Sequence, residues 1–159
     1  MSKLKLVFFG IFAFSPVQAT TTDEEAKPVV VELKSFKLPE AQSDLFGFNE
    51  GEGKLFFYTN GKATAKIKLP GDGDYEIVVK ASGDKALNEG AKFKMAIDGK
   101  TVGKETETTD GEPRDYKFPA TLKAGEHELT IEFTNDVYKE GEYDRNLYVF
   151  AVELRKDKK

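Results

Sequence analysis

The sequence of 159 residues contains no cysteine, no tryptophan and a single histidine. Without cysteine, no disulfide can stabilise the fold and no thiol can act as a nucleophile or a metal ligand. The core alone, or a bound metal, must therefore hold the domain together. The formal net charge is −4, with acidic and basic residues spread evenly along the chain. This charge argues against nucleic acid as a partner.

The N-terminal segment has the pattern of a secretory signal peptide. Two lysines precede an apolar run from Leu6 to Phe14, and small residues occupy Val17 and Ala19. The apolar run is too short to cross a bilayer as a permanent helix, and we expect no membrane anchor. We expect a signal peptide over residues 1–19, a flexible leader over 20–27, and a secreted or periplasmic protein. A buried N-terminal strand is the alternative.

Long amphipathic helices are also missing, and apolar residues alternate with polar ones nearly everywhere. Alternation with a period of two is typical of strands that are buried on one face. Asp98-Gly99 lies between two alternating runs and predicts a tight hairpin. The nearly continuous apolar run from Leu147 to Leu154 predicts a central strand, and we expect the stretch from Glu40 to Gly53 to be irregular.

Short strands that are separated by regularly spaced turns predict an all-β fold, an antiparallel β-sandwich of the jelly-roll type. We expect this single domain over residues 28–155, followed by a charged tail over 156–159. "VVVELKSFKL", from Val29 to Leu38, is expected to open it as a strand.

Catalytic groups are scarce. His127 falls in the inward phase of an alternating strand, where a structural histidine is the expected role. No serine occupies a Gly-x-Ser-x-Gly elbow. The 28 Asp and Glu residues always offer some pair of acids, so a glycoside-cleaving site has no specific signal. We therefore expect no enzymatic activity.

The stretch "FTNDVYKEGEYDRNLYV", from Phe133 to Val149, concentrates oxygen ligands at the two ends of one loop. Asp136 follows one predicted strand, and Asp144 and Asn146 precede the next. Carboxylates, amide oxygens and backbone carbonyls are the ligands that Ca²⁺ prefers. A simple hairpin loop, in which Asn-Asp forms the turn and Asp144 pairs with a nearby cation, is the alternative.

The order "YTNGKATAKIKLPGDGDYEIVVKASGD…GAKFKMAIDGK…LKAGEHELTIEFTNDVYKEGEYDRNLYV" resembles the calcium-dependent xylan-binding modules of carbohydrate-binding families 36 and 60. The likeness runs from about Val29 to Leu154, and the "FTND…DRNLYV" ending is its most specific part. The resemblance implies a β-sandwich that binds sugar through a bound Ca²⁺, whose coordination shell the vicinal hydroxyls of the sugar complete.

The resemblance also implies site residues. Asp136 and Asp144 correspond to calcium ligands, Tyr143 to a residue that offers its backbone carbonyl, and Asn146 to a ligand or a brace of the loop. Glu89, in "ALNEGAK", lies where these modules carry a Glu near the sugar.

The sequence departs from the family pattern at two points. Phe150 stands where the family often has an Asp, which we expect to weaken the metal site or its surroundings. Relatives often place a Trp near the site, whereas this chain has none. A stacking surface for sugar must then come from tyrosine. The tyrosines that could supply it are Tyr58, Tyr138, Tyr143 and Tyr148.

We expect a secreted, non-catalytic protein that binds a xylan-like polysaccharide through Ca²⁺. Tyr138, Tyr143 and Glu89 are the predicted sugar contacts. Such modules are usually attached to enzymes, so a larger enzyme or surface protein is an expected partner. The alternative is a structural or protein-binding sandwich in which calcium only stabilises the fold. A small glycoside-cleaving enzyme is a third hypothesis.

Overall fold

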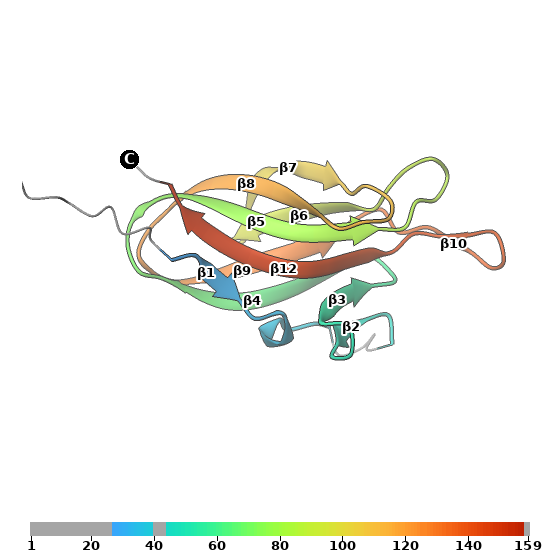
Figure 1. Cartoon of the computed structure of the whole chain (residues 1–159), viewed down its shortest axis with the longest axis horizontal. Helices are drawn as coiled ribbons and strands as arrows, with labels where there is room; N and C mark the ends of the chain where they lie inside the picture. Colours follow the sequence, from blue (N-terminus) through green and yellow to red (C-terminus); the bar gives the residue numbers. More distant parts are fainter. Residues whose placement is uncertain (1–26, 40–43, 158–159) are drawn as a thin grey trace, which may run out of the picture.

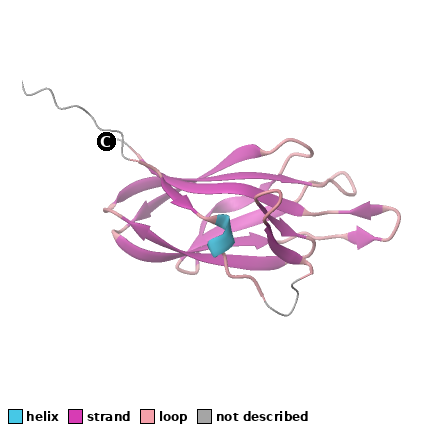
Figure 2. Cartoon of the chain, turned by 60° about the horizontal axis from the view of Figure 1, so that its bottom comes forward, coloured by secondary structure: helices cyan, strands magenta, loops and turns pink. Residues whose placement is uncertain are grey.

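The computed structural model describes residues 27–39 and 44–157, and the predicted signal peptide lies outside them. The described chain forms two packed antiparallel sheets with one short 3-10 helix, η1 (Figures 1 and 2). The elements are β1 (Val29–Val31), η1 (Leu33–Ser35), β2 (Phe46–Asn49), β3 (Lys54–Phe57), β4 (Gly61–Leu69), β5 (Gly73–Gly83), β6 (Lys92–Ile97), β7 (Lys100–Glu107), β8 (Arg114–Leu122), β9 (Gly125–Phe133), β10 (Tyr138–Lys139), β11 (Tyr143–Asp144) and β12 (Leu147–Lys156). In this part of the chain, no helix is long and apolar enough to cross a membrane.

The first sheet has the strand order β2-β3-β12-β5-β8, and β1 also pairs with β12. The second sheet has the order β4-β9-β6-β7. The β10–β11 hairpin projects from one end of the sandwich, and β12 ends at the opposite end (Figure 1). Because β12 is hydrogen-bonded to β5 on one side and to β3 and β1 on the other, the prediction of a central last strand is confirmed.

The core lies between the sheets and follows the predicted alternation. On β4, for example, Ala63, Ala65, Ile67 and Leu69 are buried. Phe93 of one sheet packs edge-on against Phe118 of the other, with ring centroids 5.6 Å apart. Each large side chain removed from water in this way contributes about 1.5–3 kcal/mol.

The β6–β7 hairpin turns at Asp98-Gly99 as the sequence predicts. Both residues have positive φ, 50° and 73°, which is the conformation of a type I′ turn.

The segment from Glu40 to Gly53 is more regular than predicted, because it contains β2. Phe46 is buried and pairs with Phe57 of β3. Gly47 interrupts the apolar pattern because the ring of Phe56 lies across it, and a Cβ there would come within 2.7 Å of that ring. The predicted opening strand from Val29 to Leu38 is likewise shorter, since only β1 is extended before η1 begins.

Candidate functional site

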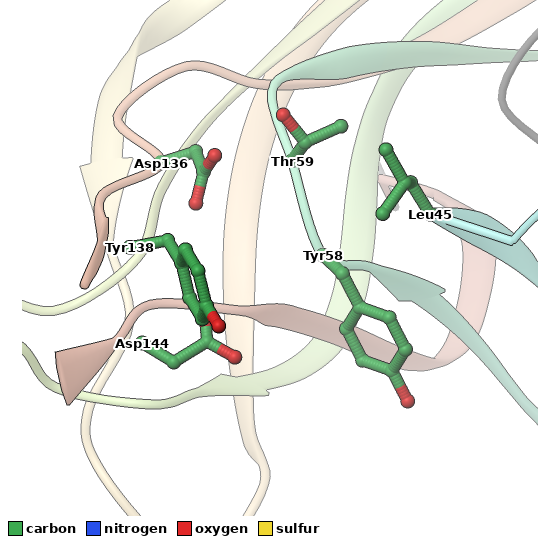
Figure 3. A pocket seen from close by; sticks show the side chains of 6 residues that line it. All are labelled: Leu45, Tyr58, Thr59, Asp136, Tyr138 and Asp144. Carbon is green, nitrogen blue, oxygen red and sulfur yellow. The ribbon is translucent and has the colours of Figure 1, made fainter. Parts of the chain in front are cut away.

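A cavity of about 420 Å³ opens beside the β10–β11 hairpin (Figure 3). Its lining residues are Leu45, Tyr58, Thr59, Asp136, Tyr138 and Asp144. In Figure 3, the side chains of Asp136, Tyr138 and Asp144 lie on one side of the cavity. Those of Leu45, Tyr58 and Thr59, which come from the region of β2 and β3, lie on the other side. The structure therefore brings together four of the residues that the sequence singled out, namely Tyr58, Asp136, Tyr138 and Asp144.

The backbone of the hairpin explains why the two carboxylates meet. Tyr138 pairs with Asp144 across β10 and β11, and the N–H of Arg145 donates to the carbonyl of Val137 at 3.0 Å. The N–H of Asp136 donates to Oδ1 of Asn60 at 2.7 Å, which ties the hairpin to the connection between β3 and β4. The hairpin thus brings Asp144 close to Asp136, which lies just after the end of β9.

Asp136 is an unusual carboxylate for this surface. Its burial raises its pKa, and the nearby charge of Asp144 acts in the same direction, against the opposing effects of Thr59, Arg145 and the backbone of Val137. Oδ1 of Asp136 is buried and has no hydrogen-bond partner. A cation between the two carboxylates would relieve both the repulsion and the unmet acceptor.

Asn146 does not line the cavity itself, but its side chain repeats this pattern. The residue is buried, and its amide nitrogen donates to Oδ2 of Asp84 at 2.9 Å and to Oδ2 of Asp144 at 3.0 Å. Two carboxylate acceptors fix the orientation of the amide, because a flipped amide would place its oxygen against them. The amide oxygen, Oδ1, is then left buried without a partner.

Among all buried side-chain nitrogens and oxygens of residues 27–39 and 44–157, only Oδ1 of Asp136 and Oδ1 of Asn146 lack a partner. Asp144 links the two residues, since it shares the cavity with Asp136 and accepts a hydrogen bond from Asn146. An unmet buried acceptor costs about 1–3 kcal/mol. Two such acceptors beside one shared carboxylate, Asp144, are expected where a bound ion or an ordered water completes the hydrogen bonding.

Asp84, which the sequence analysis did not select, organises this network. Its Oδ2 accepts hydrogen bonds from Asn146 and from the hydroxyl of Tyr148 at 2.9 Å. Burial raises the pKa of Tyr148, and the bond to Asp84 raises it further. In the sequence, Asp84 follows a strand directly in "KASGD" and is indistinguishable from a turn residue.

Arg145, between the two predicted ligands, is an internal anchor. Its side chain is buried, and its guanidinium donates to the carbonyls of Ala86, Glu89 and Asn135. These bonds fasten the loop after β5 to the residue that precedes Asp136. Arg145 therefore holds the two segments that carry Asp84 and Asp136 in a fixed relation.

Glu89 and Tyr143, which were predicted to contact sugar, do not line the cavity. The carboxylate of Glu89 forms ion pairs with Lys92 and with Arg145, and the bond from Lys92 lowers its pKa. Tyr143 pairs with Lys139 in the hairpin. Their roles as sugar or metal contacts remain predictions.

Phe150 lies away from the cavity. It lines a different hollow beside β1, together with Phe48 and Gly53, and none of the residues of that hollow lines the cavity at Asp136. The weakening of the metal site by Phe150 stays a prediction.

The donor set fits a hard cation. In the described chain, no group of three or more Asp, Glu or His side chains is placed to hold a metal by itself. A cation here would instead use the carboxylates of Asp136 and Asp144, the amide oxygen of Asn146, backbone carbonyls and ligand oxygens. Such a mixture of oxygen donors suits Ca²⁺, which accepts about 6–8 of them in variable geometry.

Comparison with known proteins points to one family. The sequence model of CBM60, described as a Ca-dependent, xylan-binding carbohydrate-binding module, matches residues 76–159. No curated protein sequence matches the chain.

Solved structures share the fold. The CBM36-1 domain of a multidomain xylanase from the hindgut metagenome of Trinervitermes trinervoides superposes with a TM-score of 0.64 at 13% identity, over 84% of this chain and 100% of that one. A CBM36 module in complex with calcium and xylotriose gives 0.57 at 19% identity, over 80% and 98%. A family 35 module from Clostridium thermocellum gives 0.57 at 12% identity, over 83% and 100%. At these identities the likeness shows the fold, and the predicted β-sandwich is confirmed.

Proposed function

The chain belongs to CBM60, the Ca-dependent xylan-binding family of carbohydrate-binding modules, because the sequence model of that family matches more than half of it. On this premise we propose that the protein binds a xylan-like polysaccharide through Ca²⁺ at the cavity beside the β10–β11 hairpin. The observation that supports this proposal best is the pair of unpartnered buried oxygens on Asp136 and Asn146.

The residues that would hold the ion are Asp136, Asp144 and Asn146, with the backbone carbonyl of Tyr143 as a further donor. Calcium, when bound, supplies coordination positions that neighbouring hydroxyls of a sugar can fill. Asp84 keeps the amide of Asn146 oriented, and Arg145 keeps Asp136 and the loop after β5 together. The site is thus organised before any ligand arrives, which lowers the entropic cost of binding.

Tyr58 and Tyr138 supply the apolar walls. These two residues are 41% and 65% exposed, and Leu45 beside them is 40% exposed. Exposed aromatic rings pack against the apolar faces of sugar rings, while the polar groups between them fix orientation. A shallow site of this kind buries little area, so we expect weak affinity, with a dissociation constant on the order of 10–100 μM.

We further propose that the protein is exported and acts without catalysis. The two lysines, the apolar run and Ala19 support export. We also propose a larger enzyme or surface protein as a partner, since one of the similar domains is part of a multidomain xylanase.

Affinity gels that contain xylan or another polysaccharide test the function. We expect xylan to retard the wild-type protein in the presence of Ca²⁺ but not of chelator, and Asp144→Ala to migrate freely in both. Asp98→Ala, a carboxylate far from the cavity, is the matched control and should be retarded like the wild type. Retention that persists in chelator would contradict the metal-dependent mechanism. Calcium-dependent melting without retention on any gel would indicate that the ion only stabilises the fold.

A further inference from the structure

The solvent-facing side of β3 and β12 carries four partly exposed aromatic rings, of which only Tyr58 lines the cavity. We call Phe56, Tyr58, Tyr148 and Phe150 the aromatic row. On β3 and β12 the inward residues Leu55, Phe57, Leu147 and Val149 are fully buried, and the row occupies the outer face between and beyond them. The register places Tyr148 directly opposite Phe56.

The row is continuous with the cavity through Tyr58. This residue lines the cavity. The centroid of its ring lies 4.7 Å from that of Phe56 and 6.4 Å from that of Tyr148, which it meets edge-on. Phe56 in turn lies over Gly47. The ring of Tyr58 is therefore held between fixed neighbours, with part of its surface open to solvent.

A bulge carries the row further along β12. The pairing of β12 with β5 shifts register between Val149 and Ala151, which places Phe150 at the irregularity. The ammonium group of Lys54 lies 4.2 Å from the ring centroid of Tyr148 and 5.9 Å from that of Phe150. Phe150 then borders the hollow of about 370 Å³ between β3 and β1.

The same sheet face changes character beyond this point. Around Ala151, the next hollow is bordered mostly by charged side chains, namely Lys80, Asp115, Glu153 and Arg155. A solvent-facing sheet surface is normally polar, as it is there. Beyond Phe150, the aromatic row thus gives way to charged side chains.

We propose that a polysaccharide chain held at the cavity continues over Tyr58 and along the aromatic row to Phe150. The occupant is a neutral, unbranched, β-linked chain of the xylan type, because successive sugar rings offer apolar faces to aromatic side chains and hydroxyls to the polar groups beside them. This inference rests on the proposed function and extends it from a site for one sugar unit to a track for several sugar units.

The length of the sugar chain distinguishes the track from the calcium-dependent site alone. With Ca²⁺ present, titration calorimetry should show that the wild type binds a xylose hexasaccharide about three- to tenfold more tightly than a trisaccharide, because only the longer chain reaches the distant rings. Phe150→Leu keeps an apolar side chain at the bulge and should lose most of this gain while the affinity for the trisaccharide stays unchanged. Ala151→Arg, at an exposed position beside Phe150, should do the same without removing a core contact.

Arg155→Ala is the control, since it shortens a side chain on the same strand and face outside the row. It should bind both lengths like the wild type. Equal affinity of the wild type for both lengths would overturn the track while leaving the function intact. Equal losses for both lengths in Phe150→Leu and Ala151→Arg would also overturn it. Absence of binding for either length would refute the proposed function, and the track with it.

Discussion

The two ends of the sandwich use similar polar residues in opposite ways. At the end away from the hairpin, which we call the turn end, the β6–β7 turn lies beside the turn between β8 and β9. There Oδ1 of Asp98 accepts from the N–H of Glu128 at 2.9 Å, and Oδ2 lies 2.7 Å from Nδ1 of His127. Nε2 of His127 lies 2.8 Å from the carbonyl of Lys123.

Asp72 at the turn end is satisfied in the same manner, by the N–H of Ala124 and the ammonium of Lys123. At the hairpin end, by contrast, Asp136 and Asn146 each keep a buried oxygen without a partner. The difference teaches that carboxylates and amides alone do not mark a site. What marks it is acceptor capacity that the protein itself leaves unused, because folding would otherwise tend to satisfy every buried polar group.

The largest effect that we predict concerns Arg145, the satisfied anchor of the hairpin end. Arg145→Met should lower the free energy of unfolding by about 3 kcal/mol, because one buried and two partly buried carbonyls lose their donor. Chemical denaturation measures this change. Arg155→Ala, which removes an exposed arginine, should cost less than about 1 kcal/mol. Similar losses in both variants would show that Arg145 is not an anchor.

The second-largest effect that we predict is the stabilisation of the protein by Ca²⁺ bound at the hairpin end. At a hundredfold excess of Ca²⁺ over its dissociation constant, binding to the folded state alone adds about 2.7 kcal/mol to stability. Thermal melting of the wild type should therefore shift with Ca²⁺, and Asp144→Ala should abolish the shift. Asp98→Ala at the turn end should melt earlier and yet keep the full shift. A calcium shift that survives Asp144→Ala would place the ion elsewhere.

In chelator, replacing a carboxylate by an amide should change the free energy of unfolding in opposite directions at the two ends of the sandwich. Burial and the charge of Asp144 raise the pKa of Asp136, so its ionised form is disfavoured in the folded state and stability falls as pH rises from the ordinary value through the raised one. Asp136→Asn should then raise metal-free stability near neutral pH by up to about 1 kcal/mol. Asp98→Asn should lower it, because the pKa of Asp98 is lowered by its bonds to Glu128 and His127. Denaturant titrations in chelator compare the two, and destabilisation by Asp136→Asn would remove the contrast.

The smallest effect is a pH dependence at the turn end. Bonds to Asp98 and to the carbonyl of Lys123 raise the pKa of His127, so the protonated ring donates to both acceptors. This stabilisation is complete below the ordinary pKa of about 6.5 and is lost as pH rises through the raised folded value. His127→Gln should flatten this part of the stability profile, by about 1 kcal/mol or less. A profile that is the same in both proteins would show that His127 does not contribute.

The sequence predicts the architecture well because burial on one face imposes a period of two. Val149 and Ile131, for example, are buried where the alternation places them. It misses β2, because Gly47 interrupts the pattern to make room for a ring from the neighbouring strand. That reason lies in a contact between segments, and no local rule contains it.

For the candidate site, the sequence suffices where the hairpin itself brings residues together. Asp136 and Asp144 are eight positions apart and meet through one tight loop. Asp84 and Thr59 come from other loops and have the appearance of ordinary turn residues, so only the fold reveals them. Glu89, by contrast, was selected from the sequence but lies outside the cavity, where its carboxylate pairs with Lys92 and Arg145.

A fluorescent reporter in the cavity wall tests the central claim most directly. The chain has no tryptophan, so Tyr138→Trp introduces a single indole beside Asp136 and Asp144. We predict that Ca²⁺ changes the emission of this variant in a saturable manner, that xylan then changes it again, and that chelator reverses both changes. In the double variant with Asp144→Ala, neither addition should have an effect. A xylan response in chelator, or a calcium response that persists without Asp144, would contradict a sugar site built on an ion between these two carboxylates.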